Sequence, residues 1–357
     1  MKYDFNIVTQ HSAMNYGASL QAYALKTFIQ DMGYVAGIYK ANIVQGSAKQ
    51  NLKQKIYGCV YHVLYAVHKK DFEEKNKKFL EFWDKNFDLN NDCTAKVFLA
   101  GSDQVWHPSI FNPDFYLCFA SKKSIKASYA ASIGVSKIKE EYVSEYKKYL
   151  QEFRYISLRE KEGQQEMSRI LGKDDVRCDI DPSFLLTKEK WTAISQKGNC
   201  PEKEPFVFMY ILHIPKNINS IVDWIRKETG YRVIVMDDRG YLNLKIPHTK
   251  AVRNLGPYDF LAYIREAKAV VTTSFHGTAF SIIFNKEFYS INNVAFPSRI
   301  SNIMELFQIL EISEEQTQFK RADIDFSEIN CKIEECRNKS RSYIEMLMDE
   351  ANERGEQ

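Results

Sequence analysis

Three polar loops carry the residues of this sequence that are best suited to bind or react with a ligand. They are residues 11–17 (HSAMNYG), 101–108 (GSDQVWHP) and 273–278 (TSFHGT). Each loop lies beside a short apolar run, and each contains a histidine among other polar groups. These loops are therefore the candidate sites for binding or catalysis.

The loop 273–278 has the features of an anion-binding site. His276 and Gly277 stand where the apolar run 269–272 gives way to a predicted helix. The first turn of a helix presents unpaired N–H groups and the positive end of its dipole, which favour a phosphate or a carboxylate. An imidazole also changes its protonation near neutral pH, which suits a general acid. The spacing is equally consistent with a purely structural role, in which His276 caps the helix.

The loop 101–108 offers the groups that a sugar hydroxyl or a sugar ring would contact. Asp103, Gln104 and Trp106 supply a carboxylate, an amide and an indole, which serve proton transfer, hydrogen bonding and stacking. The alternative is that Asp103 caps the next helix and Trp106 lies in the core. In the loop 11–17, Asn15 and Tyr16 are candidate sugar contacts, although Asn15 is equally suited to a tight turn.

Other motifs favour structural roles. Asp179 and Asp181 have the D-x-D spacing that binds divalent metal in some sugar transferases, but Pro182 follows at once and favours a turn. His62 and His68 are six residues apart and do not share the helical face that a metal site would use. We therefore predict no metal site.

The candidate loops fit a chain in which strands alternate with helices. Apolar runs at residues 5–9, 97–100, 206–210, 232–236 and 269–272 predict buried strands. Helices are predicted between them, with Gly33 ending the first helix and Pro257 opening a later one. Such alternation predicts parallel sheets, in which ligands bind beyond the carboxyl ends of the strands.

The interrupted periodicity between Thr187 and Pro205 predicts a domain boundary. We expect two Rossmann-like α/β domains facing across a cleft, at residues 1–187 on the acceptor side and 205–320 on the donor side. The charged stretch 321–357 has apolar residues at helical intervals and predicts a closing helix. The 357 residues agree with this number of domains.

Composition narrows the class of protein and its location. Hydrophobic residues make up 45% and charged residues 27%, which excludes a disordered chain. The net charge of +3 is too even to indicate a nucleic-acid binder. Seven scattered cysteines and the lack of a long apolar segment favour a reduced, cytoplasmic location. The basic, aromatic stretch 53–70 is either an interfacial helix at the inner face of the membrane or a buried helix with solvated lysines.

The ordered motifs resemble those of the polysaccharide pyruvyl transferase family. The residues that carry the resemblance lie at 15–25, 101–106, 128–134, 157–160, 181–183 and 274–278. It implies a fold similar to the two-domain GT-B-like glycosyltransferases and an enzyme that uses phosphoenolpyruvate as co-substrate, without a cofactor. Such an enzyme forms a pyruvate ketal on a sugar, or on a lipid-linked oligosaccharide acceptor, and releases phosphate.

The resemblance also implies roles for individual residues. His276 matches the family's histidine and Arg159 its donor-binding arginine, whereas Ser274 stands where many members have arginine. The donor site would then comprise Arg159 with Ser274, Gly277, Thr278 and Arg299.

We expect His276 to be the acid and Asp103 to be the base, or a ligand of the acceptor hydroxyl. Asn15, Tyr16, Gln104 and Trp106 are expected on the acceptor side. The alternatives are a nucleotide-sugar glycosyltransferase of similar fold and a noncatalytic protein that binds glycans or anions.

Overall fold

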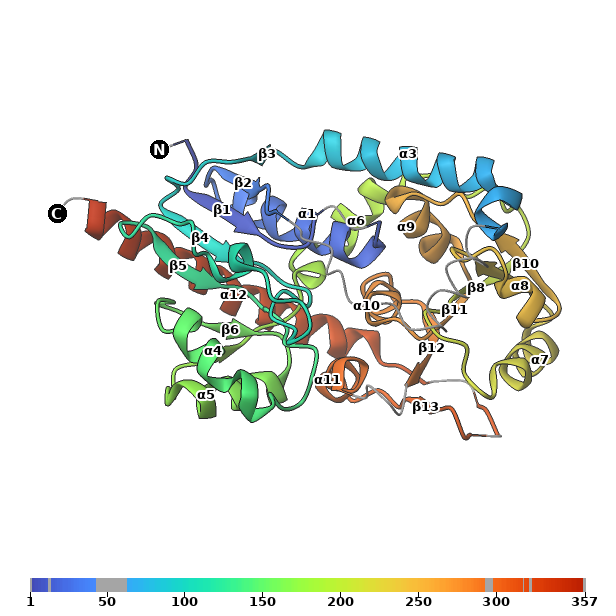
Figure 1. The fold of residues 1–357 in the computed structure, drawn as a ribbon. Coiled ribbons are helices and arrows are strands. Elements are labelled where there is room, and N and C mark those ends of the chain that lie inside the picture. Colours follow the sequence, from blue (N-terminus) through green and yellow to red (C-terminus); the bar gives the residue numbers. More distant parts are fainter. Residues whose placement is uncertain are drawn as a thin grey trace. The chain divides into compact units, whose positions relative to one another are not determined.

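The computed structural model describes residues 2–11, 14–42, 63–292, 298–316, 318–320 and 323–355 (Figure 1). The chain forms two compact units. Unit 1 comprises Met1–Gln45, Trp83–Leu186 and Ser327–Gln357, and unit 2 comprises Gly46–Phe82 and Thr187–Phe326. The predicted boundary region began at Thr187, where unit 2 resumes, but both units are discontinuous in sequence.

Unit 1 is built on a parallel sheet with strand order β3-β2-β1-β4-β5. Its strands are β1 (Phe5–Val8), β2 (Ala36–Tyr39), β3 (Leu89–Asn90), β4 (Val97–Ala100) and β5 (Ile125–Ser128). Isolated bridges from Ala127 to Tyr155 and from Ala131 to Leu158 continue the sheet. They lead to a parallel pair formed by β6 (Ser157–Leu158) and β7 (Arg177–Cys178).

The helices of unit 1 follow its strands in the order that the sequence predicts. α1 lies between β1 and β2, and Gly33, with φ of 90°, stands just beyond its end. The Asn15 side chain accepts a hydrogen bond from Ala18 N at 3.1 Å and begins this helix. The helical elements are α1 (Tyr16–Asp31), η1 (Pro113–Tyr116), α4 (Glu140–Leu150), α5 (Lys161–Leu171), η2 (Pro182–Leu185) and most of α12 (Phe326–Gly355).

Unit 2 repeats the same plan with strand order β10-β9-β8-β11-β12-β13, again parallel throughout. The strands are β8 (Phe206–Tyr210), β9 (Arg232–Met236), β10 (Thr249–Val252), β11 (Ala269–Thr272), β12 (Glu287–Asn292) and β13 (Ile312–Ser313). The helices are α6 (Lys188–Ser195), α7 (Ile218–Thr229), α8 (Leu242–Lys245), α9 (Pro257–Glu266), α10 (Phe275–Ile283) and α11 (Ser298–Leu306).

In both units the first strand lies in the interior of the sheet. The next two strands are added on one side of it, and the later strands are added on its other side. The change of side falls between β1 and β4 in unit 1 and between β8 and β11 in unit 2. Such switch points leave a crevice outside the carboxyl ends of the strands, where α/β proteins bind ligands. The three candidate loops follow β1, β4 and β11, so they lie at these two places.

The helix α3 (Lys69–Asn86) explains why the described residues 63–82 belong to unit 2 rather than to the predicted first domain. The Lys78 ammonium contacts Asp259 Oδ2 at 3.0 Å and donates to Asn254 O at 3.0 Å. Phe82 packs edge-on against Tyr258, with ring centroids 5.0 Å apart. These contacts hold the first part of α3 on unit 2.

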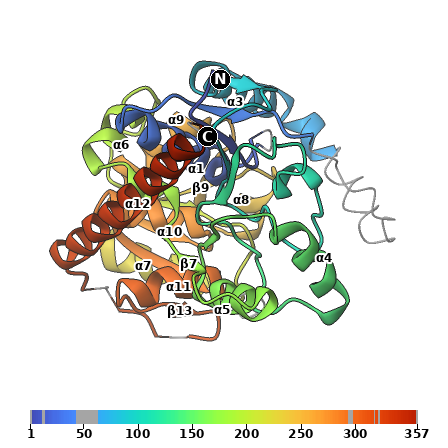
Figure 2. The same ribbon diagram turned by 90° about the vertical axis from the view of Figure 1, so that its left-hand side faces the viewer.

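The C-terminal helix α12 completes unit 1, although residues 187–326 of unit 2 separate it in sequence from the rest of that unit (Figure 2). The Tyr343 hydroxyl donates to Ser128 O at 2.9 Å, and the hydroxyls of Tyr129 and Ser340 lie 2.8 Å apart. Arg337 donates to Phe184 O at 2.7 Å and to Leu186 O at 2.9 Å. The stretch predicted as a separate helical segment is therefore a structural part of unit 1.

Some sequence predictions fall outside the described residues. They are His62, residues 53–62 of the basic stretch and the side chain of Arg299. Among the helices that are described, none is long and apolar enough to cross a membrane.

We predict that Tyr343→Ala destabilises unit 1. The side chain is 1% exposed, so its loss leaves a cavity and an unpaired Ser128 carbonyl, at a cost of about 3–5 kcal/mol. Glu345→Ala on the exposed face of the same helix is the matched control and changes stability by less than about 0.5 kcal/mol. Urea unfolding measures both, and equal midpoints for the two variants would contradict the packing of α12 described above.

Candidate functional site

A chain of buried hydrogen bonds runs along the carboxyl edge of the unit 1 sheet. The Gln21 amide nitrogen donates to Thr9 Oγ1 at 3.0 Å, and Thr9 Oγ1 donates to Ser102 O at 2.7 Å. Ser102 Oγ in turn donates to Asp181 Oδ2 at 3.2 Å. All four side chains are at most 1% exposed. The loops after β1, β4 and β7 are thus joined by direct hydrogen bonds.

Arg159 continues this chain into a buried ion cluster. Its Nη1 donates to Asp181 Oδ2 at 3.0 Å and its Nε to Glu160 Oε1 at 3.0 Å. Ser132 Oγ also donates to Glu160 Oε1, at 2.8 Å. Burial by itself lowers the pKa of Arg159, but the charges of Glu160, Asp181 and Asp103 outweigh it and raise the pKa above its usual value. The guanidinium stays charged and is held in a fixed plane.

Asp103 lies at the end of β4 in a constrained backbone conformation. Its φ is 73°, in the left-handed region that aspartate tolerates better than most residues. Its carbonyl accepts from Val105 N at 2.8 Å and from Ser132 N at 3.0 Å, and its Oδ1 accepts from Gln104 N at 2.9 Å. Asp103 as a residue is partly exposed.

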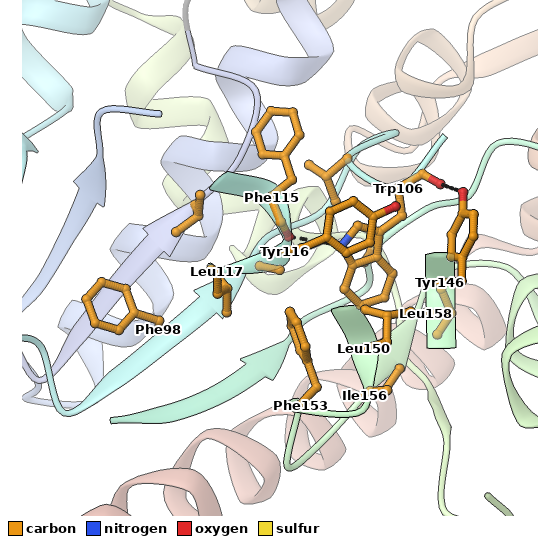
Figure 3. Close-up of a cluster of buried hydrophobic side chains, with 14 of the residues drawn as sticks. Phe98, Trp106, Phe115, Tyr116, Leu117, Tyr146, Leu150, Phe153, Ile156 and Leu158 are labelled. Carbon is orange, nitrogen blue, oxygen red and sulfur yellow. Dashed lines mark hydrogen bonds between the residues drawn. The ribbon is translucent and has the colours of Figure 1, made fainter. Parts of the chain in front are cut away.

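The structure corrects the expectation that Trp106 and Tyr16 face a sugar. Trp106 is 0% exposed and lies in the aromatic core of unit 1, edge-on to Phe153 at 5.4 Å between centroids (Figure 3). Its indole N–H, the ring's only polar group, donates to Phe115 O at 3.0 Å. Tyr16 is 2% exposed. Both rings pack in the interior because their apolar area outweighs their polar groups.

The two other residues expected on the acceptor side remain accessible. Asn15 is exposed while it caps α1, as the alternative interpretation had it. Gln104 is partly exposed and lies beside Gly134, where an added Cβ would come within 2.2 Å of the Gln104 Nε2. Gly134 also has φ of 65°, so glycine is required there for both space and conformation.

The start of α10 in unit 2 has the geometry that the sequence predicts for a strand-to-helix junction. Ser274 is the cap, and its side chain accepts from Gly277 N at 3.4 Å. Its own N–H donates to Thr272 Oγ1 at 3.0 Å. A Cβ on Gly277 would lie 2.2 Å from that same Oγ1, so only glycine lets the helix approach the strand this closely.

The side chains around this junction are buried. His276 is 9% exposed in the first turn of α10, edge-on to Phe275. Thr278 is 0% exposed, and its hydroxyl contacts Ser274 O at 3.1 Å and Ser290 Oγ at 2.7 Å. The capping role left open for this loop therefore belongs to Ser274, while His276 occupies the first turn.

Groups from neighbouring strands of unit 2 extend this site. Thr273 Oγ1 accepts from Leu212 N at 2.9 Å and thereby ties the loop after β8 to the loop after β11. Burial raises the pKa of Tyr210, the charge of Asp238 adds to the increase, and a hydrogen bond with Ser274 opposes it. Burial also raises the pKa of Asp238, although the charge of Lys75 opposes it.

The weaker sequence motifs have structural roles. Asp179 forms an ion pair with Arg177 at 2.8 Å, and Asp181 accepts from Ser183 N at 2.9 Å in the turn before η2. His68 packs edge-on against Phe72. Within the described ranges, no cluster of three or more histidine, cysteine or acidic side chains can hold a metal ion.

Sequence reasoning missed His11 as a separate site residue. It is 5% exposed at the end of β1, and burial lowers its pKa. The charge of Lys40 lowers the pKa further, and a hydrogen bond to the Ala41 backbone opposes the change. The loop 11–17 was recognised as polar, but nothing in the sequence indicated that this imidazole would be buried.

We predict that His11 makes the protein less stable in acid. Its pKa is lower in the folded state than the usual 6.5, so below about pH 6.5 the unfolded chain binds more protons than the folded protein. Stability therefore falls as the pH drops from 7.5 to 5.5, and the fall is smaller in His11→Asn. The control is His248→Asn, an exposed histidine with φ of 62° that asparagine tolerates. Urea unfolding at both pH values gives the difference, and identical pH dependence in the wild type and His11→Asn would contradict it.

Comparison with solved structures identifies the architecture. A putative UDP-N-acetylglucosamine 2-epimerase from Listeria monocytogenes has a TM-score of 0.52 and 10% identity, covering 95% of this chain and 90% of that chain. The corresponding epimerase from Neisseria meningitidis, bound to UDP-GlcNAc, has a TM-score of 0.49 and 10% identity, over 98% and 93% of the two chains. A glycosyltransferase from Rickettsia africae has a TM-score of 0.44 and 12% identity, over 99% and 93%. At such low identity the first of these likenesses shows the fold alone, and it confirms the predicted GT-B-like α/β class.

Sequence comparison identifies the family. No curated protein sequence matches the chain significantly. The family model described as polysaccharide pyruvyl transferase, however, matches residues 15–293, which is most of the 357 residues. That span includes all three candidate loops apart from His11 and its three following residues. The chain therefore belongs to the polysaccharide pyruvyl transferase family.

Proposed function

We propose that this protein transfers the enolpyruvyl carbon skeleton of phosphoenolpyruvate to two hydroxyls of a sugar. The sugar belongs to a cell-surface glycan or to its lipid-linked precursor, and the product is a cyclic pyruvate ketal. The observation that carries the proposal is the start of α10, where a buried histidine lies in the first turn of a helix. Membership of the family supports it.

In this reaction His276 gives a proton to the methylene carbon of phosphoenolpyruvate, and positive charge develops on C2. Two sugar hydroxyls add to C2 in turn, the bond from C2 to the phosphate oxygen breaks, and phosphate leaves. Of the two hydroxyl protons, one replaces the proton lost by His276, and the other is taken by Asp103 and passed to the departing phosphate. Asp103 is the proposed base, since the residue is partly exposed at the end of β4.

The anionic groups of the donor require positive potential. The proposed donor residues are Ser274, Gly277 and Thr278 at the start of α10, where the positive end of the helix dipole favours an anion. Arg159 is also proposed to bind the donor, although Glu160 and Asp181 already balance its charge. Asn15 and Gln104 remain the proposed acceptor contacts, because both are accessible.

The decisive experiment incubates purified protein with phosphoenolpyruvate and a panel of sugar acceptors. We predict phosphate release together with a new ketal methyl signal in the proton NMR spectrum. His276→Gln lowers kcat by about 100-fold or more if the imidazole is the acid, whereas the exposed-site variant His248→Asn keeps the wild-type rate. Binding of a nucleoside diphosphate, with no phosphoenolpyruvate bound in calorimetry, would instead identify a nucleotide-sugar glycosyltransferase.

We also propose that the protein is cytoplasmic and contacts the inner face of the membrane through residues 63–70. Val63 and Val67 are 64% and 68% exposed, and Lys69 and Lys70 follow Val67 after His68. Exposed apolar side chains beside lysines suit an anionic lipid surface.

We predict that the double variant Lys69→Glu and Lys70→Glu binds phosphatidylserine vesicles at least about tenfold more weakly in flotation, since each lysine near the surface contributes about 1 kcal/mol. Lys203→Glu, at an exposed position in unit 2, is the control for a charge reversal outside this segment. Equal flotation of all variants would exclude a contact through this segment.

A further inference from the structure

Two buried polar atoms beside the end of β1 have no hydrogen-bond partner in the described part of the chain. These atoms are Nε2 of His11 and Oε1 of Gln21. As residues, His11 is 5% exposed and Gln21 is 0% exposed. A buried polar group left unpaired costs about 1–3 kcal/mol. Each such group in a native protein needs an explanation, and a bound molecule that supplies the missing partner is one.

The surroundings of His11 determine which kind of group Nε2 binds. Since Nε2 has no partner, the hydrogen bond to the Ala41 backbone falls to Nδ1, which carries the ring proton. Burial lowers the pKa of His11 and keeps the imidazole neutral at physiological pH. The second nitrogen of a neutral imidazole then has a lone pair and no proton. Nε2 is therefore a hydrogen-bond acceptor.

The Gln21 amide is oriented by its own nitrogen. Nε2 of Gln21 donates to Thr9 Oγ1 at 3.0 Å and to Ala18 O at 3.1 Å. A carbonyl oxygen only accepts, so the nitrogen must occupy that side and Oε1 must point away from it. The second unpaired atom is thus also an acceptor.

The two acceptors belong to one small region of unit 1. Gln21 bonds directly to Thr9, which precedes His11 by two residues, and Thr9 also donates to Ser102 O at 2.7 Å. This region lies at the switch point between β1 and β4, where the order of the strands changes side. Ligands of parallel α/β sheets bind at that point.

We propose that His11 Nε2 and Gln21 Oε1 bind hydroxyl groups of the acceptor sugar. This inference rests on the proposed function and adds the residues and the ligand class at the end of β1. Two uncharged acceptors suit a neutral polyol, whose hydroxyls donate, and they disfavour the charged oxygens of a phosphate or carboxylate, which need donors or positive charge. The same chemistry assigns the anionic donor elsewhere, to sites with positive potential.

Binding is tested first without any reaction. Methyl β-galactoside, methyl α-mannoside and methyl β-N-acetylglucosaminide are titrated separately into ¹⁵N-labelled protein, without phosphoenolpyruvate. We expect at least one sugar to shift the His11 ring nitrogen signals, with Nε2 moving as it accepts a hydrogen bond. Inorganic phosphate, the anionic probe, leaves these signals unchanged. If none of the three sugars shifts them, or if phosphate does, the proposal is overturned.

Variants then test each acceptor separately. His11→Asn keeps an amide N–H for Ala41 but lacks Nε2, and Gln21→Met keeps a similar volume without Oε1. Each lowers the affinity for the responsive sugar about 3- to 10-fold, as expected for one lost hydrogen bond. Gln30→Met on the exposed face of α1 is the matched control and leaves affinity unchanged. Thermal unfolding verifies that each variant is folded, and unchanged affinity in both folded variants would overturn the proposal.

The kinetic assay separates this inference from the proposed function. If phosphate is released, His11→Asn raises the KM for the acceptor and leaves the KM for phosphoenolpyruvate unchanged. If no acceptor gives phosphate but a sugar still binds at His11, the proposed function fails and the sugar site stands. If phosphate is released but the KM for the acceptor is unchanged in both variants, the proposed function stands and the sugar site at His11 and Gln21 is overturned.

Discussion

The buried guanidinium of Arg159 is the interaction on which the carboxyl edge of unit 1 depends. A charge in that position is tolerated only because Glu160 and Asp181 accept its hydrogen bonds at 3.0 Å. Glu160 follows β6, and Asp181 follows β7 and also binds Ser102 after β4. Arg159 thus fixes the loops after β6 and β7 relative to each other, and Asp181 joins the loop after β4 to them. Thr9 donates to Ser102 O and Gln21 donates to Thr9 Oγ1, and these hydrogen bonds extend the rigidity to α1.

The sheet architecture was largely predictable because it depends on local patterns. The strands expected at residues 97–100, 206–210, 232–236 and 269–272 have those bounds in the structure, and Pro257 opens α9. Continuous apolar runs are typical of strands buried on both faces of a parallel sheet. The division into units was less predictable. Lys78 reaches Asp259, and Arg337 reaches Phe184, across more than 150 residues, and no local pattern records such contacts.

The candidate site was predictable in its loops but not in the orientation of its side chains. Ser274 and Asn15 cap helices, as their types and positions allow. The same sequence reasoning placed Trp106 on a sugar, because an indole is equally suited to stacking and to a core. Its burial depends on Phe153, Tyr116 and other rings that are brought together only by folding. His11 was overlooked for the converse reason, since polar loops rarely bury an imidazole.

The position of α12 has a consequence for the synthesis of the protein. The segment Ser327–Gln357 follows every residue of unit 2 in the sequence, yet unit 1 needs it to cover Tyr129 and the end of β5. All the residues of unit 2 leave the ribosome before that helix does. Domains of larger proteins generally fold as units, with the N-terminal one first during synthesis. Here the order is reversed, because unit 2 can fold before unit 1 has all of its residues. A nascent chain that stalls before α12 then exposes an apolar face of unit 1, which is the kind of surface that chaperones bind.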